Sequence, residues 1–229
     1  MAKAKKKKEK KKIFGENWGF VQIFMIFVIG CIIGVYYEQF LHLFKTGLWE
    51  SRQGIIYGPF NPVYGLGFGM FVIFLGKNIK TRKWWLTFIY ACLLGGIAEY
   101  ATSWISTELF HAESWDYSDR LLNIGGRTTI PYMLFWGAGG SLFMFYIYPL
   151  FVKLINKIPY KVGKIAFPIL VVFMILNMFI SYSALIRQAS RIQGNEPANA
   201  FSRFLDWHYN DEFLKKYYPN MVHRDVGSK

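Results

Sequence analysis

The stretch WGFVQIFMIFVIGCIIGVYYEQFLHLF, residues 18–44, is apolar almost throughout and carries one acidic side chain, Glu38. An α-helix needs about 20 consecutive apolar residues to cross the hydrocarbon core of a bilayer, which is roughly 30 Å thick. The stretch therefore predicts an uncleaved membrane-spanning helix. Gly30 and Gly34 lie four residues apart within it, a spacing that predicts the close approach of a neighbouring helix.

Further apolar blocks follow along the chain, so we expect about five spans in all, the later four at residues 60–76, 84–110, 130–152 and 165–186. The composition agrees, because 53% of the 229 residues are hydrophobic, 20% are aromatic and only 18% are charged. Soluble domains average about 25% charged residues. The sequence thus predicts an all-α, polytopic integral membrane helical bundle.

The basic residues are distributed unevenly, and their distribution predicts an orientation. Residues 1–17, 77–83 and 153–164 hold eight, four and four Lys or Arg, whereas each of the two intervening loops holds two. Cytoplasmic loops carry the excess of Lys and Arg in membrane proteins. We therefore expect a multi-pass protein of the cell (plasma) membrane with a cytoplasmic N-terminus.

The chain divides into three predicted parts: a lysine-rich cytoplasmic segment (1–17), a transmembrane domain (18–186) and an extracytoplasmic tail (187–229). The net charge of +13 comes largely from the run Lys3 to Lys12. Beside a span, such a run favours the anionic lipid of the inner leaflet, at roughly 1 kcal/mol per basic side chain, over nucleic acid. In the tail, apolar residues recur at about helical spacing. They predict an amphipathic helix that lies on the outer membrane face or caps the bundle, or else a plain solvated helix.

Glu99 is a carboxylate expected within a span, somewhat past its midpoint. A charge near the membrane centre costs at least ~2.5 kcal/mol, so it needs a partner or an aqueous cavity. Thr102, Ser103 and Ser106 follow at i+3, i+4 and i+7, which predicts one polar stripe lining an outward-facing polar cavity. The alternative is a protonated Glu99 that bonds a backbone carbonyl or a tyrosine and only fixes helix packing.

The two predicted outer loops contribute further polar residues. Their arginines can pair with carboxylates or bind an anionic group of a substrate, because guanidinium pairs with both in bidentate fashion. A purely structural lattice of ion pairs is the alternative. The candidate substrate-binding residues are Glu38, Glu50, Arg52, Tyr57, Tyr64, Glu99, Ser103, Glu108, Trp115, Asp116, Tyr117, Asn123 and Arg127.

The stretch GIIYGPFNPVYG, residues 54–65, combines two prolines with three glycines at a predicted membrane boundary. Irregular backbone at that depth is tolerated only where it is buried in protein or lines a cavity. A short span interrupted by Gly and Pro is also a sequence indicator of a transporter site. The alternative is a stiff turn that aims the second helix.

Several motifs are missing from the sequence. It contains no glycine-rich loop ending in Lys-Ser or Lys-Thr, so we do not expect the chain itself to hydrolyse ATP. It also lacks an HExxH motif, a Gly-x-Ser-x-Gly elbow and a Cys/His cluster. We therefore predict no catalytic residue, metal site or cofactor, and we expect Cys31 and Cys92 to be free thiols.

Three stretches together, GIIYGPFNPVYGLG (54–67), EYATSWISTELFHAESWDYS (99–118) and NIGGR (123–127), resemble the bacterial CmpB-like family of type IV ABC-transporter permeases. The resemblance covers about residues 34–150. It implies a polytopic permease but no particular substrate. The matching positions are Glu50, Arg52, Tyr57, Gly58, Pro59, Pro62, Tyr64, Gly65, Glu99, Tyr100, Glu108, Trp115, Asp116, Tyr117, Asn123 and Arg127.

The leading interpretation is a permease-like subunit that handles a small polar or amphiphilic substrate. Energy would come from a separate ATPase subunit, from an ion gradient or from no source at all. The small bundle favours a homo-oligomer or a second membrane chain. The main alternative is a membrane-embedded enzyme acting on a lipid headgroup or polyprenyl carrier, with Glu99 or Glu38 as general base. A third is an accessory protein that binds another membrane component.

Overall fold

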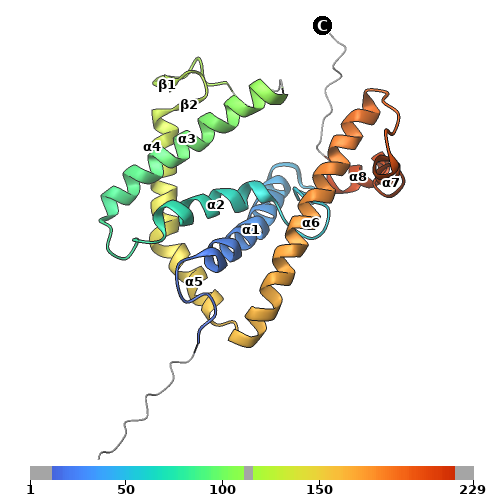
Figure 1. Cartoon of the computed structure of the whole chain (residues 1–229). Helices are drawn as coiled ribbons and strands as arrows, with labels where there is room; N and C mark the ends of the chain where they lie inside the picture. Colours follow the sequence, from blue (N-terminus) through green and yellow to red (C-terminus); the bar gives the residue numbers. More distant parts are fainter. Residues whose placement is uncertain (1–11, 111–115, 220–229) are drawn as a thin grey trace, which may run out of the picture. The chain divides into compact units, whose positions relative to one another are not determined.

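The computed structural model describes residues 12–110 and 116–219, apart from the side chains of residues 106 and 108–110. The regular secondary structure of this part of the chain is almost wholly helical (Figure 1). Its helices are α1 (Phe20–Thr46), α2 (Pro62–Leu75), α3 (Trp84–Phe110), α4 (Ile130–Leu142), the π-helix η1 (Phe143–Ile147), α5 (Tyr148–Asn156), α6 (Tyr160–Ile192), α7 (Ala200–His208) and α8 (Asp211–Tyr217). Two short strands, β1 (Asn123–Ile124) and β2 (Thr128–Thr129), pair antiparallel.

Within the described residues, four helical segments are long and apolar enough to cross a membrane: Phe20–Thr46, Trp84–Ile105, Ile130–Asn156 and Tyr160–Ile192. The helix α2 is apolar too, but its 14 residues extend only about 21 Å, less than the hydrocarbon thickness. The predicted all-α membrane bundle is confirmed. Where about five spans were expected, the described residues contain four helical segments long enough to span and one short apolar helix.

The helical segment Ile130–Asn156 contains a local widening. The π-helix η1 separates α4 from α5, and the Tyr148 amide donates to the Phe143 carbonyl, five residues back. Pro149 follows at once in the first turn of α5. Because proline has no amide hydrogen and its ring crowds the preceding turn, a wider turn at this point lets the helix continue.

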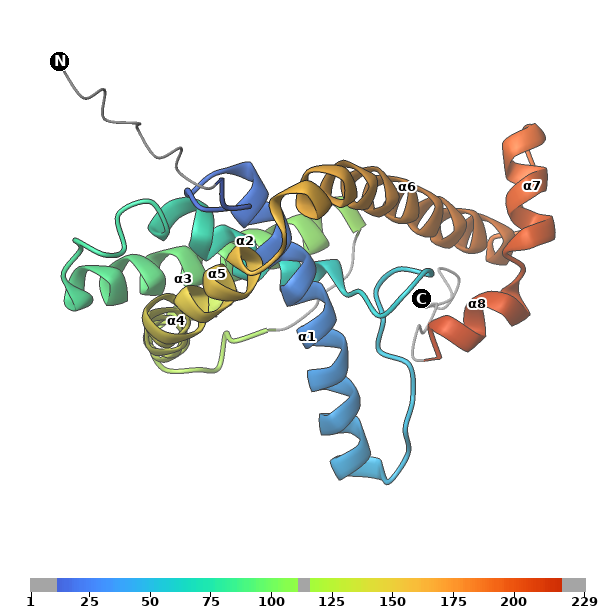
Figure 2. The ribbon, with the colours of Figure 1, turned by 90° about the horizontal axis from the view of Figure 1, so that it is seen from below.

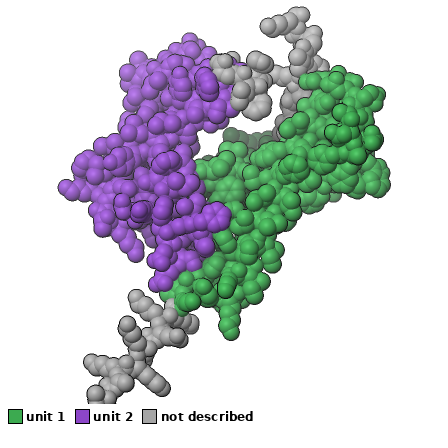
Figure 3. Space-filling view, in the orientation of Figure 1, with its two compact units in different colours: residues 1–14, 24–68, 158–229 green, residues 15–23, 69–157 purple. Residues whose placement is uncertain are grey.

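The chain forms two compact units, coloured separately in Figure 3. Unit 1 comprises Met1–Phe14, Phe24–Phe68 and Ile158–Lys229, and thus contains most of α1, the start of α2 and all of α6 to α8. Unit 2 comprises Gly15–Ile23 and Gly69–Lys157, with α3, the β-hairpin, α4, η1 and α5.

In unit 1, glycines bring α1 and α2 together. A Cβ added at Gly34 would lie 2.2 Å from the Tyr64 ring, and one added at Gly30 would lie 3.2 Å from the Cα of Gly65. A Cβ added at Gly65 would lie 2.4 Å from the Cys31 sulfur. The predicted close approach at Gly30 and Gly34 is therefore confirmed, and small residues allow it on both helices.

In unit 2, α3 packs against α4 in the same way. A Cβ added at Gly95 would lie 2.2 Å from Cγ of Trp136, and one added at Gly96 would lie 2.7 Å from the Met133 side chain. A large side chain of α4 thus occupies the space above each glycine of α3. This packing fixes the helix that carries Glu99.

The tail differs from the single amphipathic helix that its spacing indicated. The span α6 continues to Ile192, and two short helices, α7 and α8, follow it (Figure 2). These helices pack onto a buried cluster formed by Ile56, Ala184, Leu205, Tyr209 and Leu214. Within unit 1, α7 and α8 are therefore folded against α6 and the segment that contains Ile56.

Candidate functional site

The hairpin between α3 and α4 is shaped by a tight turn. Gly125 and Gly126 have φ angles of +58° and +68°, and the Arg127 amide donates to the Ile124 carbonyl at 3.1 Å. Two successive positive φ angles define a type I′ turn, which glycine adopts without strain. The NIGGR motif thus reverses the chain within two residues and leads directly into α4.

Asn123 and Asp116 are used inside the loop. The side-chain oxygen of Asn123, Oδ1, accepts from the Gly126 amide at 3.0 Å. Its Nδ2 donates to the backbone carbonyls of Ser118 and Arg120 at 3.0 and 2.9 Å. The Asp116 carboxylate accepts from the hydroxyl and the amide of Ser118, which lowers the pKa of Asp116. Both residues were predicted to bind substrate, yet their contacts are those of a loop scaffold.

Glu99 lies half-buried on α3 and is bonded by hydroxyls from the loop. Thr128 Oγ1 donates to one carboxylate oxygen at 2.6 Å, and the Tyr117 hydroxyl donates to the other at 3.3 Å. Burial and the nearby Glu99 raise the pKa of Tyr117, so this hydroxyl stays protonated and keeps donating. The Tyr117 contact is the kind that the packing alternative anticipated.

Arg127 lies against the same face of α3. Its Nη1 donates to Ser103 Oγ at 3.3 Å and to Thr107 Oγ1 at 3.0 Å, and its guanidinium lies 5.9 Å from the centre of the Tyr100 ring. Together with Glu99, these hydroxyls form a polar stripe at i, i+4 and i+8.

The stripe differs in membership from the predicted one. Thr102 is exposed, the Ser106 side chain lies outside the described residues, and Thr107, which sequence reasoning passed over, takes part. Spacing by four would have found Thr107. The side chain of Glu108 and the whole of Trp115, both predicted to bind substrate, also lie outside the described part of the chain.

A second polar group, in unit 1, joins the end of α1 to the segment that follows it. Arg52 Nη2 contacts His42 Nδ1, and the opposite ring nitrogen of His42, Nε2, lies 3.2 Å from a Glu50 carboxylate oxygen. Because guanidinium only donates, Nδ1 must accept and Nε2 carries the proton toward Glu50. Arg52 also lies 3.9 Å from Glu50, so here the ion-pair alternative describes the contacts. His42 was not among the predicted residues.

The Gly/Pro-rich segment packs against α6 through two buried isoleucines. Ile55 and Ile56 are 0% and 2% exposed, and the Ile56 amide donates to Ser181 Oγ at 2.9 Å. Asn177 binds both backbone groups of Tyr57, accepting from its amide at 3.1 Å and donating to its carbonyl at 2.6 Å. The irregular backbone is thus buried in protein at Ile55 and Ile56, and side chains of α6 bond its polar groups from Ile56 to Tyr57.

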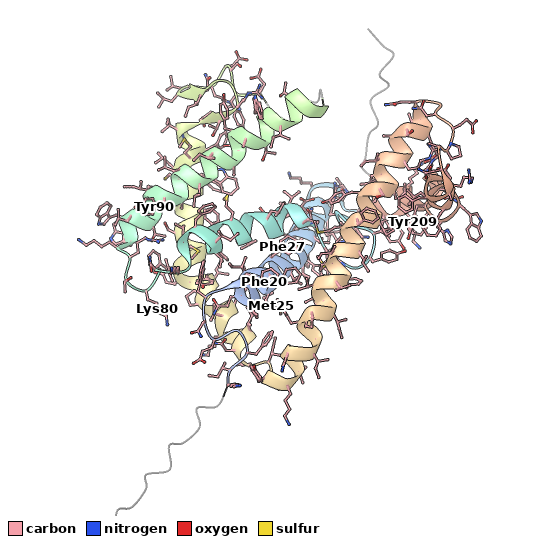
Figure 4. The ribbon with its side chains drawn as sticks, in the orientation of Figure 1. Phe20, Met25, Phe27, Lys80, Tyr90 and Tyr209 are labelled. Carbon is pink, nitrogen blue, oxygen red and sulfur yellow. The ribbon has the colours of Figure 1, made fainter. Side chains whose placement is uncertain are left out.

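The remaining predicted residues of unit 1, Tyr57, Tyr64 and Glu38, contact neighbouring elements of the unit. The Tyr57 hydroxyl is 2.7 Å from that of Tyr209, which lies beside the carboxyl-terminal half of α6 (Figure 4). Tyr64 packs edge-on against Tyr37, with ring centres 6.4 Å apart, and its hydroxyl interacts with Glu38. Tyr57 therefore ties the loop to the tail, and Glu38 joins α1 to α2.

Sequence reasoning also missed the polar side chains of α6. Asn177 and Ser181 are buried, four residues apart, in the apolar middle of α6. Nearer its carboxyl end, Arg187 is 7% exposed and pairs with Asp206 at 2.8 Å. Their helical spacing within a predicted span was the available signal. Among the described residues, no three His, Cys, Asp or Glu side chains are grouped to hold a metal ion, and Cys31 and Cys92 are free thiols.

A known protein family matches most of the chain. The ABC_trans_CmpB family, described as "Putative ABC-transporter type IV", matches residues 25–182. No curated protein and no solved structure matches the chain. The matched range includes both polar groups and excludes the lysine-rich start, Arg187, α7 and α8.

Proposed function

Since the chain belongs to the ABC_trans_CmpB family, we propose that it is a multi-pass permease subunit of the cell membrane that moves a small polar or amphiphilic substrate. The observation that carries the proposal is the family match across residues 25–182, which include most of the residues of the four apolar spans. The substrate class rests on the polar stripe of α3.

The proposed energy source is ATP hydrolysis by an ATPase that is not among the 229 residues of this sequence. The sequence has no P-loop, so ATP hydrolysis in a transporter built with this chain would come from outside these 229 residues. The loop between α2 and α3 presents exposed basic side chains, among them Lys80 (Figure 4). We assign this loop to the cytoplasmic face, where an ATPase would bind.

Glu99 and Arg127 are the proposed substrate contacts. They place a carboxylate and a guanidinium along one stripe in the second half of α3, an apolar helix in which charges are costly and mark functional sites. Hydroxyls hold each group in a fixed position, from Thr128 and Tyr117 for Glu99 and from Ser103 and Thr107 for Arg127. A substrate group that carries a positive charge can replace the neutral hydroxyls that bond Glu99, because an ion pair adds Coulombic attraction to the hydrogen bond.

Capture from native membranes tests the proposal. The tagged full-length chain is purified in mild detergent, and its complex is assayed for ATP hydrolysis and for a subunit whose sequence contains a P-loop. We expect both with the native chain. We expect both to be reduced in the double variant Lys80→Glu/Lys83→Glu, and unchanged in the matched control Lys215→Glu/Lys216→Glu on α8.

The same preparation distinguishes the enzymatic alternative. A chain that purifies without any nucleotide-hydrolysing subunit, yet converts a lipid substrate in a reaction lost on Glu99→Gln, would contradict a permease role. Binding of another membrane protein without flux or turnover would leave an accessory role.

A further inference from the structure

The helix α7 exposes an aromatic face. Phe201 and Phe204 are each 40% exposed, and Trp207 is 78% exposed. These residues are spaced by three along the helix and therefore share one side of it. Leu205, on another side, is only 3% exposed. Three adjacent exposed aromatic side chains on a two-turn helix form an apolar patch of the kind that marks a protein or membrane contact.

Ion pairs with α6 fix the direction of this aromatic face. Arg187 donates to Asp206 through Nε and Nη2, each at 2.8 Å, and Arg191 Nη1 donates to Asp206 at 2.6 Å. Arg191 Nη2 also pairs with Asp211 of α8 at 2.6 Å. Because Asp206 and Leu205 are turned toward α6, Trp207 is left on the exposed side of α7, whereas Phe201 remains in contact with α6.

The aromatic face is continuous with the exposed side of a candidate span. Phe179 of α6 is 58% exposed and stacks on Phe201, with ring centres 5.9 Å apart and an interplanar angle of 22°. Phe201 in turn stacks on Phe204 at 6.3 Å and 16°. One row of rings thus leads from the apolar surface of α6, which a bilayer would cover, onto α7.

We propose that the face formed by Phe201, Phe204 and Trp207 binds the boundary between lipid headgroups and acyl chains at the carboxyl end of α6. Tryptophan is enriched at this depth, since its ring is apolar and its N–H is polar. Arg203 is exposed on the same helix and can reach lipid phosphate, whereas the acidic residue of α7, Asp206, is turned inward.

The length of α6 agrees with this placement. Its 33 residues extend about 50 Å, some 20 Å more than the hydrocarbon core, and its last two turns carry Arg187 and Arg191, so we place those turns beyond the acyl chains. Because α7 packs beside those turns, it lies at the level where a bilayer ends. We call this membrane contact of α7 the anchor. It does not depend on the transport function, and with it the tail is bound to the membrane instead of being a solvated helix.

Fluorine NMR on the full-length chain in phospholipid vesicles tests the anchor. All tryptophans are replaced biosynthetically by 5-fluorotryptophan, and the variant Trp207→Phe, which keeps an aromatic ring, assigns the Trp207 resonance. The vesicles carry either a lipid spin-labelled near the top of its acyl chain or a water-soluble gadolinium chelate. We expect the lipid label to broaden the Trp207 resonance by at least twofold and the chelate to leave it unchanged.

Two results would overturn the anchor. Broadening by the chelate alone would place Trp207 in water. Protection from both reagents at high lipid-to-protein ratio would mean that protein, such as a second copy of the chain, covers the face.

Discussion

The side-chain amide of Asn177 binds both polar groups of the Tyr57 backbone, its Nδ2 donating to the carbonyl at 2.6 Å and its Oδ1 accepting from the amide at 3.1 Å. Ser181, one turn along α6, accepts from the amide of Ile56. Backbone groups without partners are costly in a membrane. The two α6 side chains therefore explain how a segment rich in Gly and Pro can be buried beside a span.

Replacing Asn177 by leucine should destabilise unit 1. The variant leaves the part-buried amide and carbonyl of Tyr57 without their side-chain partner, at up to about 1–3 kcal/mol for each group. We expect a lower midpoint of denaturant unfolding in detergent. Leu176→Ala, at a 57%-exposed position on the same helix, is the control and should shift the midpoint much less. Equal shifts for the two variants would contradict the role of Asn177.

Two glycine substitutions in unit 2 should change stability in opposite directions. Alanine at Gly95 would put a Cβ 2.2 Å from Trp136, an overpacking that costs about 1–3 kcal/mol. Alanine at Gly139 of α4 meets no atom within 4 Å and should stabilise the helix by roughly 0.5–1 kcal/mol. Thermal unfolding in detergent compares the two. A stabilised Gly95→Ala variant would show that α3 and α4 do not pack as described.

Asp206 should make the docking of α7 depend on pH. Hydrogen bonds from Arg187, and then from Arg191, hold the pKa of this carboxyl below its usual range, with burial opposing them. A depressed pKa contributes stability that is present above the unfolded value of about 3.9 and is lost as the pH falls through the lower folded value.

The Asp206→Asn variant should lack this contribution. Limited proteolysis of residues 193–199, which join α6 to α7, measures the docking. We expect faster cleavage of the variant at neutral pH, and a cleavage rate that rises on acidification in the native chain but much less in the variant. Asp119→Asn, an exposed change in unit 2, serves as control and should behave as the native chain does. Identical pH profiles for native and Asp206→Asn chains would sink the prediction.

The predicted orientation can be tested by cysteine labelling in intact cells. Cys31 and Cys92 are 0% and 9% exposed, so they should contribute little background. With a membrane-impermeant thiol reagent, Asp119→Cys, in the loop between α3 and α4, should be labelled. Lys80→Cys should be labelled only after the cells are opened. The reverse pattern would invert the topology.

The parts of the fold that depend on local spacing could be predicted from the sequence. Apolar blocks predicted the candidate spans. Small residues at Gly30 and Gly34 predicted the close approach of a helix, which the structure shows at Tyr64. The polar stripe was found through Ser103, although its true period of four adds Thr107 and omits Thr102.

What the sequence could not provide depends on long-range docking. Asn177 and Tyr57 are 120 residues apart, so their pairing required the tertiary fold. The loop roles of Asn123 and Asp116 depend on a turn type that two glycines permit but do not specify. His42 was passed over because its partner Arg52 lies beyond the end of α1, where helical periodicity gives no information.

The ATP hydrolysis rate of the complex captured from native membranes, compared between the native chain and Glu99→Gln, tests the central claim most directly. The glutamine side chain keeps an acceptor for Thr128, so the complex should still assemble, but the loss of the charge should lower the hydrolysis rate about tenfold, as a change of roughly 1.4 kcal/mol would. An unchanged hydrolysis rate in an intact complex would show that Glu99 serves helix packing and that the proposed substrate site is wrong.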